Sequence, residues 1–232
     1  MHDHPHNEEH FKSPDVVRDI VIGMADGLTV PFALAAGLSG AVDNNHIIIT
    51  AGVAEIVAGS IAMGLGGYLS AKTESEHYHS ELKREYWEVD KLPHKEKEEV
   101  REVLEQYGIS RDTSNKVADE MALDKDKWVD FMMKFELGLE KPDDKRAGKS
   151  AANISLSYIV GGFIPLTAYM FTSHPHDGLI YSSVITLLAL FVFGFFKSKA
   201  TGQPPVYGAL RTTIIGALAA AAAFGIASLI KA

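Results

Sequence analysis

The fold of this 232-residue chain is decided by the stretch Ile20–Val42, which reads IVIGMADGLTVPFALAAGLSGAV and carries one charged residue, Asp26. A helix needs about 20 apolar residues to cross roughly 30 Å of hydrocarbon. This stretch is therefore long and apolar enough to span a membrane. Four later stretches meet the same criterion, and they are His46–Ala71, Ala151–Thr172, Gly178–Phe196 and Thr212–Ile230.

Charged residues are concentrated between the second and third of these spans. Residues 73–149 hold 21 of the 30 acidic residues and 15 of the 22 Lys and Arg residues. Five apolar core helices in a soluble protein would need a larger polar shell than this segment can supply. We therefore predict an all-α membrane protein with five transmembrane helices. Its predicted parts are a flexible His-rich tail (1–15), spans one and two (16–72), a cytosolic helical metal-binding domain (73–149) and spans three to five (150–232).

Composition and charge placement narrow the function classes. The net charge of −8 and the absence of a basic run argue against nucleic acid as a partner. The absence of cysteine excludes thiolate zinc sites and cysteine nucleophiles. Lys and Arg flank the first span, fill the insert and recur in the loop 197–211, whereas the two other loops have none. The positive-inside rule then places the N-terminus and the insert in the cytosol and the C-terminus on the other side.

Two carboxylates lie within the predicted spans. An ionised carboxylate at membrane depth is costly unless it is paired, hydrated or neutral. Asp26 and Glu55 have no Lys or Arg in the neighbouring spans to pair with, which favours an ion or proton site over an interfacial or structural role. Glu55, Gly59 and Met63 recur every four residues and share one helix face. A carboxylate and a thioether on one face suit a path for a transition metal, although Met63 alone would be ordinary packing.

The first span also holds three pairs of small residues at GxxxG-like spacing, which lets helices approach closely. They are Gly23 with Gly27, Ala33 with Gly37, and Ala36 with Gly40. Internal packing and a dimer seam both explain such pairs.

The charged insert is predicted to be helical, with span two continuing through Asp90. Further helices are expected from Pro93 to Gly108, over Ser114–Leu123 and over Asp126–Leu139. At about 100° per residue, Glu96 and Glu99 fall at the edge of an apolar side. That side is formed by Val100, Val103, Leu104 and Tyr107.

Two other helices of the insert place carboxylates at an apolar edge in the same way. Glu81, Glu85 and Glu88 form a stripe on the continuation of span two. On the last helix, Met132, Met133 and Glu136 lie beside an expected buried stripe of Trp128, Phe131, Phe135 and Leu139. Carboxylates brought together repel one another, and divalent cations are the natural compensation. Oxygen ligands together with methionine favour Fe²⁺, Mn²⁺ or Co²⁺ over Ca²⁺ or Mg²⁺.

The run from Val17 to Ala41 resembles the first span of the vacuolar iron transporter family, particularly its plant members. Span two is similar as well, through Glu55, Ser60–Gly64 and Tyr68–Ser70. The resemblance implies a homodimer in the vacuolar membrane that exchanges cytosolic Fe²⁺ for protons, with no obligatory cofactor. It implies a pore on the dimer axis, with Asp26, Glu55 and Met63 on the route.

The resemblance also implies that the insert is the metal-binding domain of the family. The implied ligands are Glu85, Glu88, Glu96, Glu99, Met132, Met133 and Glu136. Glu81 fits the helix geometry without being tied to the family motif. Neither coupling nor the choice among Fe²⁺, Mn²⁺, Co²⁺, Ni²⁺ and Zn²⁺ follows from the sequence, so a channel remains an alternative to an exchanger.

Two other functions compete with transport. A di-iron ferroxidase would need Glu-x-x-His motifs on two helices, whereas Glu74…His77 and Glu76…His79 overlap on one. A membrane-anchored iron sensor or storage protein would explain the insert but not Asp26 and Glu55. We therefore expect a transporter rather than an enzyme. The N-terminal histidines could bind metal weakly, and they are His2, His4, His6 and His10.

Overall fold

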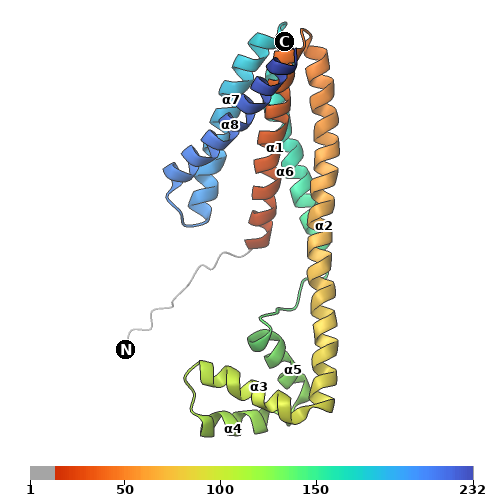
Figure 1. The fold of residues 1–232 in the computed structure, drawn as a ribbon, viewed down its shortest axis with the longest axis vertical. Helices are drawn as coiled ribbons and strands as arrows, with labels where there is room; N and C mark the ends of the chain where they lie inside the picture. Colours follow the sequence, from red (N-terminus) through yellow and green to blue (C-terminus); the bar gives the residue numbers. More distant parts are fainter. Residues whose placement is uncertain (1–13, 232) are drawn as a thin grey trace, which may run out of the picture. The chain divides into compact units, whose positions relative to one another are not determined.

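The computed structural model describes residues 14–231, which form eight α-helices and one short π-helix (Figure 1). The predicted His-rich tail lies largely outside these residues. The helices are α1 (Pro14–Ala41), α2 (Asn45–Lys91), α3 (Pro93–Gln106), α4 (Arg111–Met121), α5 (Lys125–Phe131), η1 (Met132–Glu136), α6 (Arg146–Met170), α7 (Pro175–Ala200) and α8 (Pro205–Lys231). The all-helical prediction is confirmed. Five of the described helices are long and apolar enough to cross a membrane, namely α1, α2, α6, α7 and α8.

The chain divides into two compact units. Among the described residues, the span unit comprises those up to Tyr68 and those from Ala147 onward, and the insert unit comprises Leu69–Arg146. Helix α2 belongs to both, because its apolar first half lies in the span unit and its charged second half in the insert unit. No Pro or Gly interrupts the chain between Tyr68 and Lys91, so the sequence allows one uninterrupted helix through this change of composition.

Within the span unit, glycines set the close packing of α6 against α1 and α2. A Cβ on Gly27 would collide with the backbone of Tyr158, and a Cβ on Gly52 would overlap the side chain of Leu166. Gly37, farther along α1, faces Ala223 of α8 instead. The structure therefore uses the glycines of the GxxxG-like pairs for packing inside one chain, which was one of the two explanations the sequence left open.

The two ends of the span unit are built differently. The α1–α2 turn and the α6–α7 turn lie at one end (Figure 1), where the side-chain amide of Asn45 joins them. It donates to the carbonyl oxygens of Tyr169 at 3.2 Å and Thr172 at 2.7 Å. The α7–α8 turn and the start of α1 lie at the opposite end.

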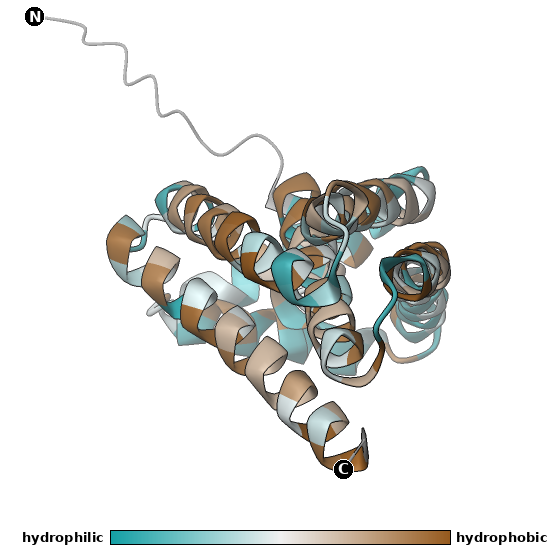
Figure 2. Ribbon diagram, turned by 90° about the horizontal axis from the view of Figure 1, so that it is seen from above, coloured by the Kyte–Doolittle hydropathy of each residue, from teal (hydrophilic) through white to brown (hydrophobic). Residues whose placement is uncertain are grey.

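The outer surface of the span unit is apolar. Large aliphatic side chains are exposed on α2, α7 and α8, including Ile61, Leu188 and Leu218. Apolar residues recur along these helices in Figure 2. Exposed apolar surface on this scale is what a bilayer would cover. The apolar side chains of these helices are suited to contact with lipid.

The insert unit has its own hydrophobic core. The core gathers residues from α2, α3, α4, α5 and η1 and comprises Tyr78, Val89, Val100, Ala118, Trp128, Val129, Met132 and Met133. Three helices predicted for this region exist, with shifted bounds. The second begins at Arg111 rather than Ser114, and the third gives way to the π-helix at Met132 rather than continuing to Leu139 as an α-helix.

Two residues expected in this core are exposed. Tyr107 is 73% exposed because α3 ends at Gln106, and Gly108 then adopts φ = 82° to turn the chain away. Phe135 is 48% exposed because it lies in the π-helix, where the 3.6-residue period used for the prediction does not hold. The expected buried stripe of the last helix is therefore wrong at Phe135. Val129 and the two methionines are buried there instead.

Candidate metal centre

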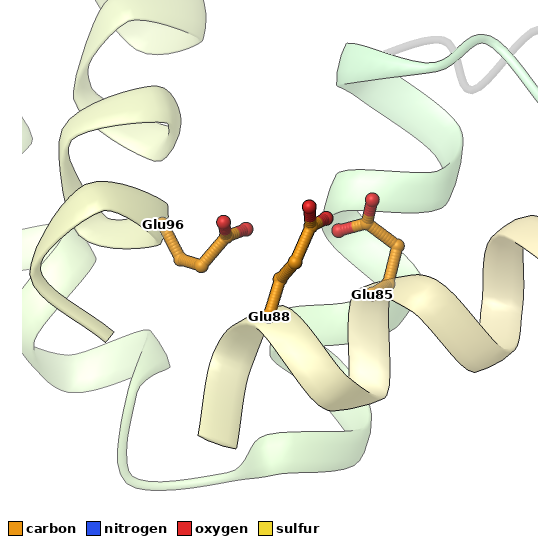
Figure 3. Close-up of side chains that lie close together, drawn as sticks. All are labelled: Glu85, Glu88 and Glu96. Atoms are coloured by element: carbon orange, nitrogen blue, oxygen red, sulfur yellow. The ribbon is translucent and has the colours of Figure 1, made fainter. Parts of the chain in front are cut away.

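Three glutamates of the insert unit converge at the junction between α2 and α3. Each of Glu85, Glu88 and Glu96 places one carboxylate oxygen within 4.8 Å of the others. The convergence follows from the local chain, because α2 ends at Lys91 and Pro93 starts α3 after a single intervening residue. Proline suits a first helical turn, where its missing N–H has no partner to lose. Figure 3 shows the three carboxyl groups turned toward a common space.

Two of these carboxyl groups are buried without compensation. Glu85 is 2% exposed and Glu96 is 1% exposed. One carboxyl oxygen of Glu85 and both of Glu96 have no hydrogen-bond partner among the described residues. Burial, reinforced by the nearby carboxylates of Glu136 and Glu88, raises the pKa of Glu85 to about 7. Burial and the carboxylate of Glu99 raise the pKa of Glu96 to about 8.

Basic side chains pair with Glu88 and with neighbouring glutamates, but with neither Glu85 nor Glu96 among the described residues. The guanidinium of Arg84 lies 2.9 Å from Glu81 and 3.5 Å from Glu88. The ammonium of Lys95 lies 2.7 Å from Glu99. Glu81 is not one of the three converging residues. When they are ionised, Glu85 and Glu96 give the buried centre an excess of negative charge that a divalent cation could neutralise.

The spacing of the three carboxylates suits a small divalent ion. A metal bound about 2.1 Å from each oxygen holds its ligand oxygens no more than about 4.2 Å apart. The described spacing of up to 4.8 Å therefore needs only small side-chain rotations to reach coordination. A site of this kind must lose its protons before it binds metal, so its affinity depends on pH.

The π-helix carries the remaining predicted ligands. The N–H of Leu137 donates to the carbonyl of Met132 at 3.1 Å, which is the i to i−5 bond of a π-turn. Met132 and Met133 are both buried in the core that also contains Val89 and Val100. Val89 follows Glu88 directly, and Val100 lies one helical turn beyond Glu96. The methionines thus belong to the same core as the residues next to the carboxylate cluster.

Glu136, at the end of the π-helix, faces the same carboxylates. The residue as a whole is exposed, but loss of water around its carboxyl group raises its pKa, and the Glu99 carboxylate adds to the effect. Glu136 is also the largest charge-based cause of the raised pKa of Glu85. Five predicted glutamate ligands therefore influence one another electrostatically, and they are Glu85, Glu88, Glu96, Glu99 and Glu136.

The span unit holds the second set of predicted residues near the middle of its helices. Asp26 is the thirteenth of the 28 residues of α1, and Glu55 lies about 15 Å along α2 from Asn45. The hydroxyl of Tyr158, at the middle of α6, donates a hydrogen bond to Glu55. The other oxygen of Glu55 is buried with no hydrogen-bond partner among the described residues.

Glycine and tyrosine bring these helices together around Glu55. A Cβ on Gly59 would overlap the Tyr158 hydroxyl and lie 2.8 Å from a Glu55 oxygen, so the absence of a side chain lets α6 approach α2. Tyr158 also adjoins Gly27, the residue after Asp26. Asp26 and Met63 are half-buried, and the Asp26 carboxylate takes part in no described ion pair.

Sequence reasoning overlooked Tyr158. A tyrosine among apolar residues is usually taken as a packing or interfacial residue. The signal that could have identified it is its position at the middle of a span, because a buried phenol requires a hydrogen-bond partner.

The fold and the two sites together define a class of protein: a helical membrane protein of five spans with an acidic, methionine-containing helical insert suited to divalent metal. Residues 17–228 match the family model described as the VIT family. The chain therefore belongs to the VIT family.

Individual relatives agree with this assignment. The chain is 53% identical over 226 residues to "Vacuolar iron transporter 1" of Arabidopsis thaliana, covering 97% of this chain and 90% of that protein. It is 52% identical over 226 residues to the Tulipa gesneriana protein of the same name, covering 97% and 92%. It is 38% identical over 221 residues to "Protein CCC1" of Saccharomyces cerevisiae, covering 91% and 68%.

Proposed function

We propose that this protein transports Fe²⁺ from the cytosol into the vacuole in exchange for protons. The names of its plant relatives support vacuolar iron transport. The observation that carries the proposal is the arrangement at Glu55. This residue lies between apolar helices. One of its carboxyl oxygens accepts a hydrogen bond from Tyr158, and the other has no hydrogen-bond partner among residues 14–231. Such an oxygen can bind either a cation or a proton.

The insert unit would serve as the collector of the metal. At cytosolic pH, Fe²⁺ competes with protons for Glu85, Glu88 and Glu96, and metal binding removes the repulsion among them. Glu99, Glu136, Met132 and Met133 complete the proposed ligand set. In this scheme, the insert and the N-terminus face the cytosol and the C-terminus faces the lumen.

Asp26, Glu55 and Met63 would carry the ion through the spans. Each site offers few ligands, so the ion is not held tightly. On the acidic side, protons neutralise the carboxylates and release the metal. Protons bound to the same carboxylates can then return, which couples the two fluxes.

We also propose that the transporter is a homodimer. A groove between α1 and α8 is lined by apolar or small residues, with Thr29 as the exception. The lining includes Ala33, Gly37, Ala41 and Ala223. A second copy seated there would bring the two α1 helices together, as a pore lined by span one requires. Light scattering of the detergent-solubilised protein would test this, and a monomeric mass would contradict it.

The decisive experiment measures Fe²⁺ uptake into proteoliposomes that contain a pH dye. The proposal expects uptake that requires an acidic lumen and makes the lumen more alkaline. Uptake that is indifferent to the gradient would identify a channel. Tight Fe²⁺ binding without uptake would instead favour a membrane-anchored sensor or storage protein.

A further inference from the structure

A cavity of about 320 Å³ with a partly polar lining lies at the α7–α8 turn, within the span unit. It is bounded by the last turn of α7, the connecting loop and the first turns of α8. Its polar lining includes Lys197, Thr201, Gln203, Tyr207 and Arg211. None of these residues has a part in the proposed iron route.

Backbone packing fixes the walls of this cavity. Gly202 adopts φ = 69°, which turns the chain between the two helices. A Cβ on Gly208 would overlap the side chain of Ser198, so α8 can approach α7 closely only because residue 208 is glycine. The hydroxyl of Thr201 donates to the carbonyl oxygens of Lys197 at 3.1 Å and Ser198 at 3.2 Å. The Thr201 hydrogen bonds close the end of α7, and the contact of Gly208 with Ser198 brings α8 against it.

The two charged side chains of the cavity lining, Lys197 and Arg211, are both positive and both exposed. Among the described residues, no carboxylate forms an ion pair with Lys197 or Arg211. The sequence contains no Asp or Glu after Asp177. The insert unit differs, because carboxylates pair with its Arg84, Lys95 and Arg111 side chains. Both cations line the same cavity, so an anion bound in it would be attracted by each of them.

The uncharged lining adds hydrogen-bond donors to these cations. The Gln203 amide and the Tyr207 hydroxyl can donate, whereas the hydroxyls of Thr201 and Thr212 already donate to backbone carbonyls. A guanidinium, an ammonium, an amide and a phenol match the several acceptor oxygens of a phosphate group. A carboxylate has two oxygens and would leave some of these donors unused.

We propose that this cavity binds a phosphate monoester, presented by the headgroup of an anionic phospholipid. Its position favours a lipid source. The cavity lies where the apolar stretch of α7 ends at Phe196 and that of α8 begins at Thr212, the level at which headgroups meet the hydrocarbon. Basic pockets between transmembrane helices are established sites for phosphorylated headgroups. A soluble phosphate has the same chemistry and is distinguished by the test.

The test measures binding of short-chain lipids to the full-length chain in a neutral detergent by native mass spectrometry. The probes are dioctanoyl phosphatidylinositol 4-phosphate, dioctanoyl phosphatidylinositol, which lacks the monoester, and inorganic phosphate. We expect the phosphorylated lipid to bind at least about tenfold more tightly than phosphatidylinositol, because only the monoester uses both cations. Inorganic phosphate bound as tightly as the lipid, and lost with the same variants, would support the site and assign it to soluble phosphate.

The variants decide whether the cavity is responsible. Lys197→Gln and Arg211→Gln, singly and together, should each weaken binding of the phosphorylated lipid. Lys199→Gln is the matched control, because it removes the same charge from the same helix end outside the cavity lining. Equal weakening by the control would show general attraction to basic residues and overturn the proposal. Equal binding of phosphatidylinositol, or no binding by the unaltered chain, would overturn it as well.

Discussion

The two groups of carboxylates in this protein lie in opposite surroundings. In the insert unit, Glu85, Glu88 and Glu96 converge to within 4.8 Å, and among the described residues only Glu88 of the three has a basic partner, Arg84. In the span unit, Glu55 has a tyrosine hydroxyl as its partner, and its other oxygen has no partner in the described structure. A dense cluster favours capture of a cation, whereas sparse ligands favour its release. The difference indicates a division between collecting the ion and passing it on.

Transport by carboxamide variants gives the largest expected difference between the two groups. Asp26→Asn should reduce Fe²⁺ uptake into proteoliposomes to the level of empty vesicles, because α1 itself carries no other carboxylate near its middle. Glu96→Gln should lower uptake at limiting Fe²⁺ and leave uptake at saturating Fe²⁺ largely intact. Uptake that is lost equally in both variants at saturating Fe²⁺ would mean that the insert forms part of the pore.

The next largest expected effect is the pH dependence of the free energy of unfolding of the insert unit. Glu85 and Glu96 have folded-state pKa values of about 7 and about 8, above the ordinary value of 4.5. The folded insert therefore binds more protons than the unfolded chain between about pH 4.5 and 8, and the metal-free insert should become less stable as pH rises through this window. The limiting slope is about 1.4 kcal/mol per pH unit for each group.

Tryptophan fluorescence can follow this transition in the full-length protein. Both tryptophans of the chain, Trp87 and Trp128, lie in the insert unit, so the signal reports on that unit alone. Glu85→Gln with Glu96→Gln should flatten the pH dependence, whereas Glu102→Gln, on the exposed side of α3, should leave it unchanged. A metal-free insert that gains stability from pH 5 to pH 8 would show that these carboxylates are compensated.

Methionine replacement should have a smaller effect, confined to metal choice. Met132→Leu and Met133→Leu keep the core filled, because leucine and methionine have similar volumes. Loss of the thioethers should weaken Fe²⁺ and Co²⁺ binding by up to about tenfold and change Mn²⁺ binding less, because sulfur prefers the softer ions. Competition with a fluorescent metal indicator measures both affinities. Unchanged Fe²⁺ affinity would assign the methionines to packing alone.

The smallest expected effect concerns a contact outside both groups. The Tyr86 hydroxyl donates to Asp126 at 2.8 Å and joins α2 to α5. Asp126→Asn should destabilise the insert by about 1 kcal/mol or less, because the bond is exposed to water. Fe²⁺ affinity should not change. A large loss of affinity in a variant that still unfolds cooperatively would show that the α2–α5 contact positions the ligands.

Hydropathy and charge predicted the five spans and the helical character of the insert, because both follow from composition over long stretches. Helix projection was less successful over the last part of the insert, where it assumed one period and the chain changes to a π-turn at Met132. Tyr158 was missed because its role depends on contacts with Glu55 and Gly59, which lie about 100 residues away in the sequence. The roles of the predicted ligands stay predictions.

The π-turn from Met132 to Glu136 has a consequence for how this protein tolerates insertions and deletions. A π-turn accommodates one more residue than an α-helical turn of the same height. Deleting a single residue within it would restore an α-helical turn and leave the segment beyond in place. Deleting one residue from α5 instead would rotate that segment by about 100°, and the carboxyl group of Glu136 would leave the Glu85–Glu99 neighbourhood although its codon was untouched. The π-turn is therefore the one place in this helix where a single deletion should be tolerated.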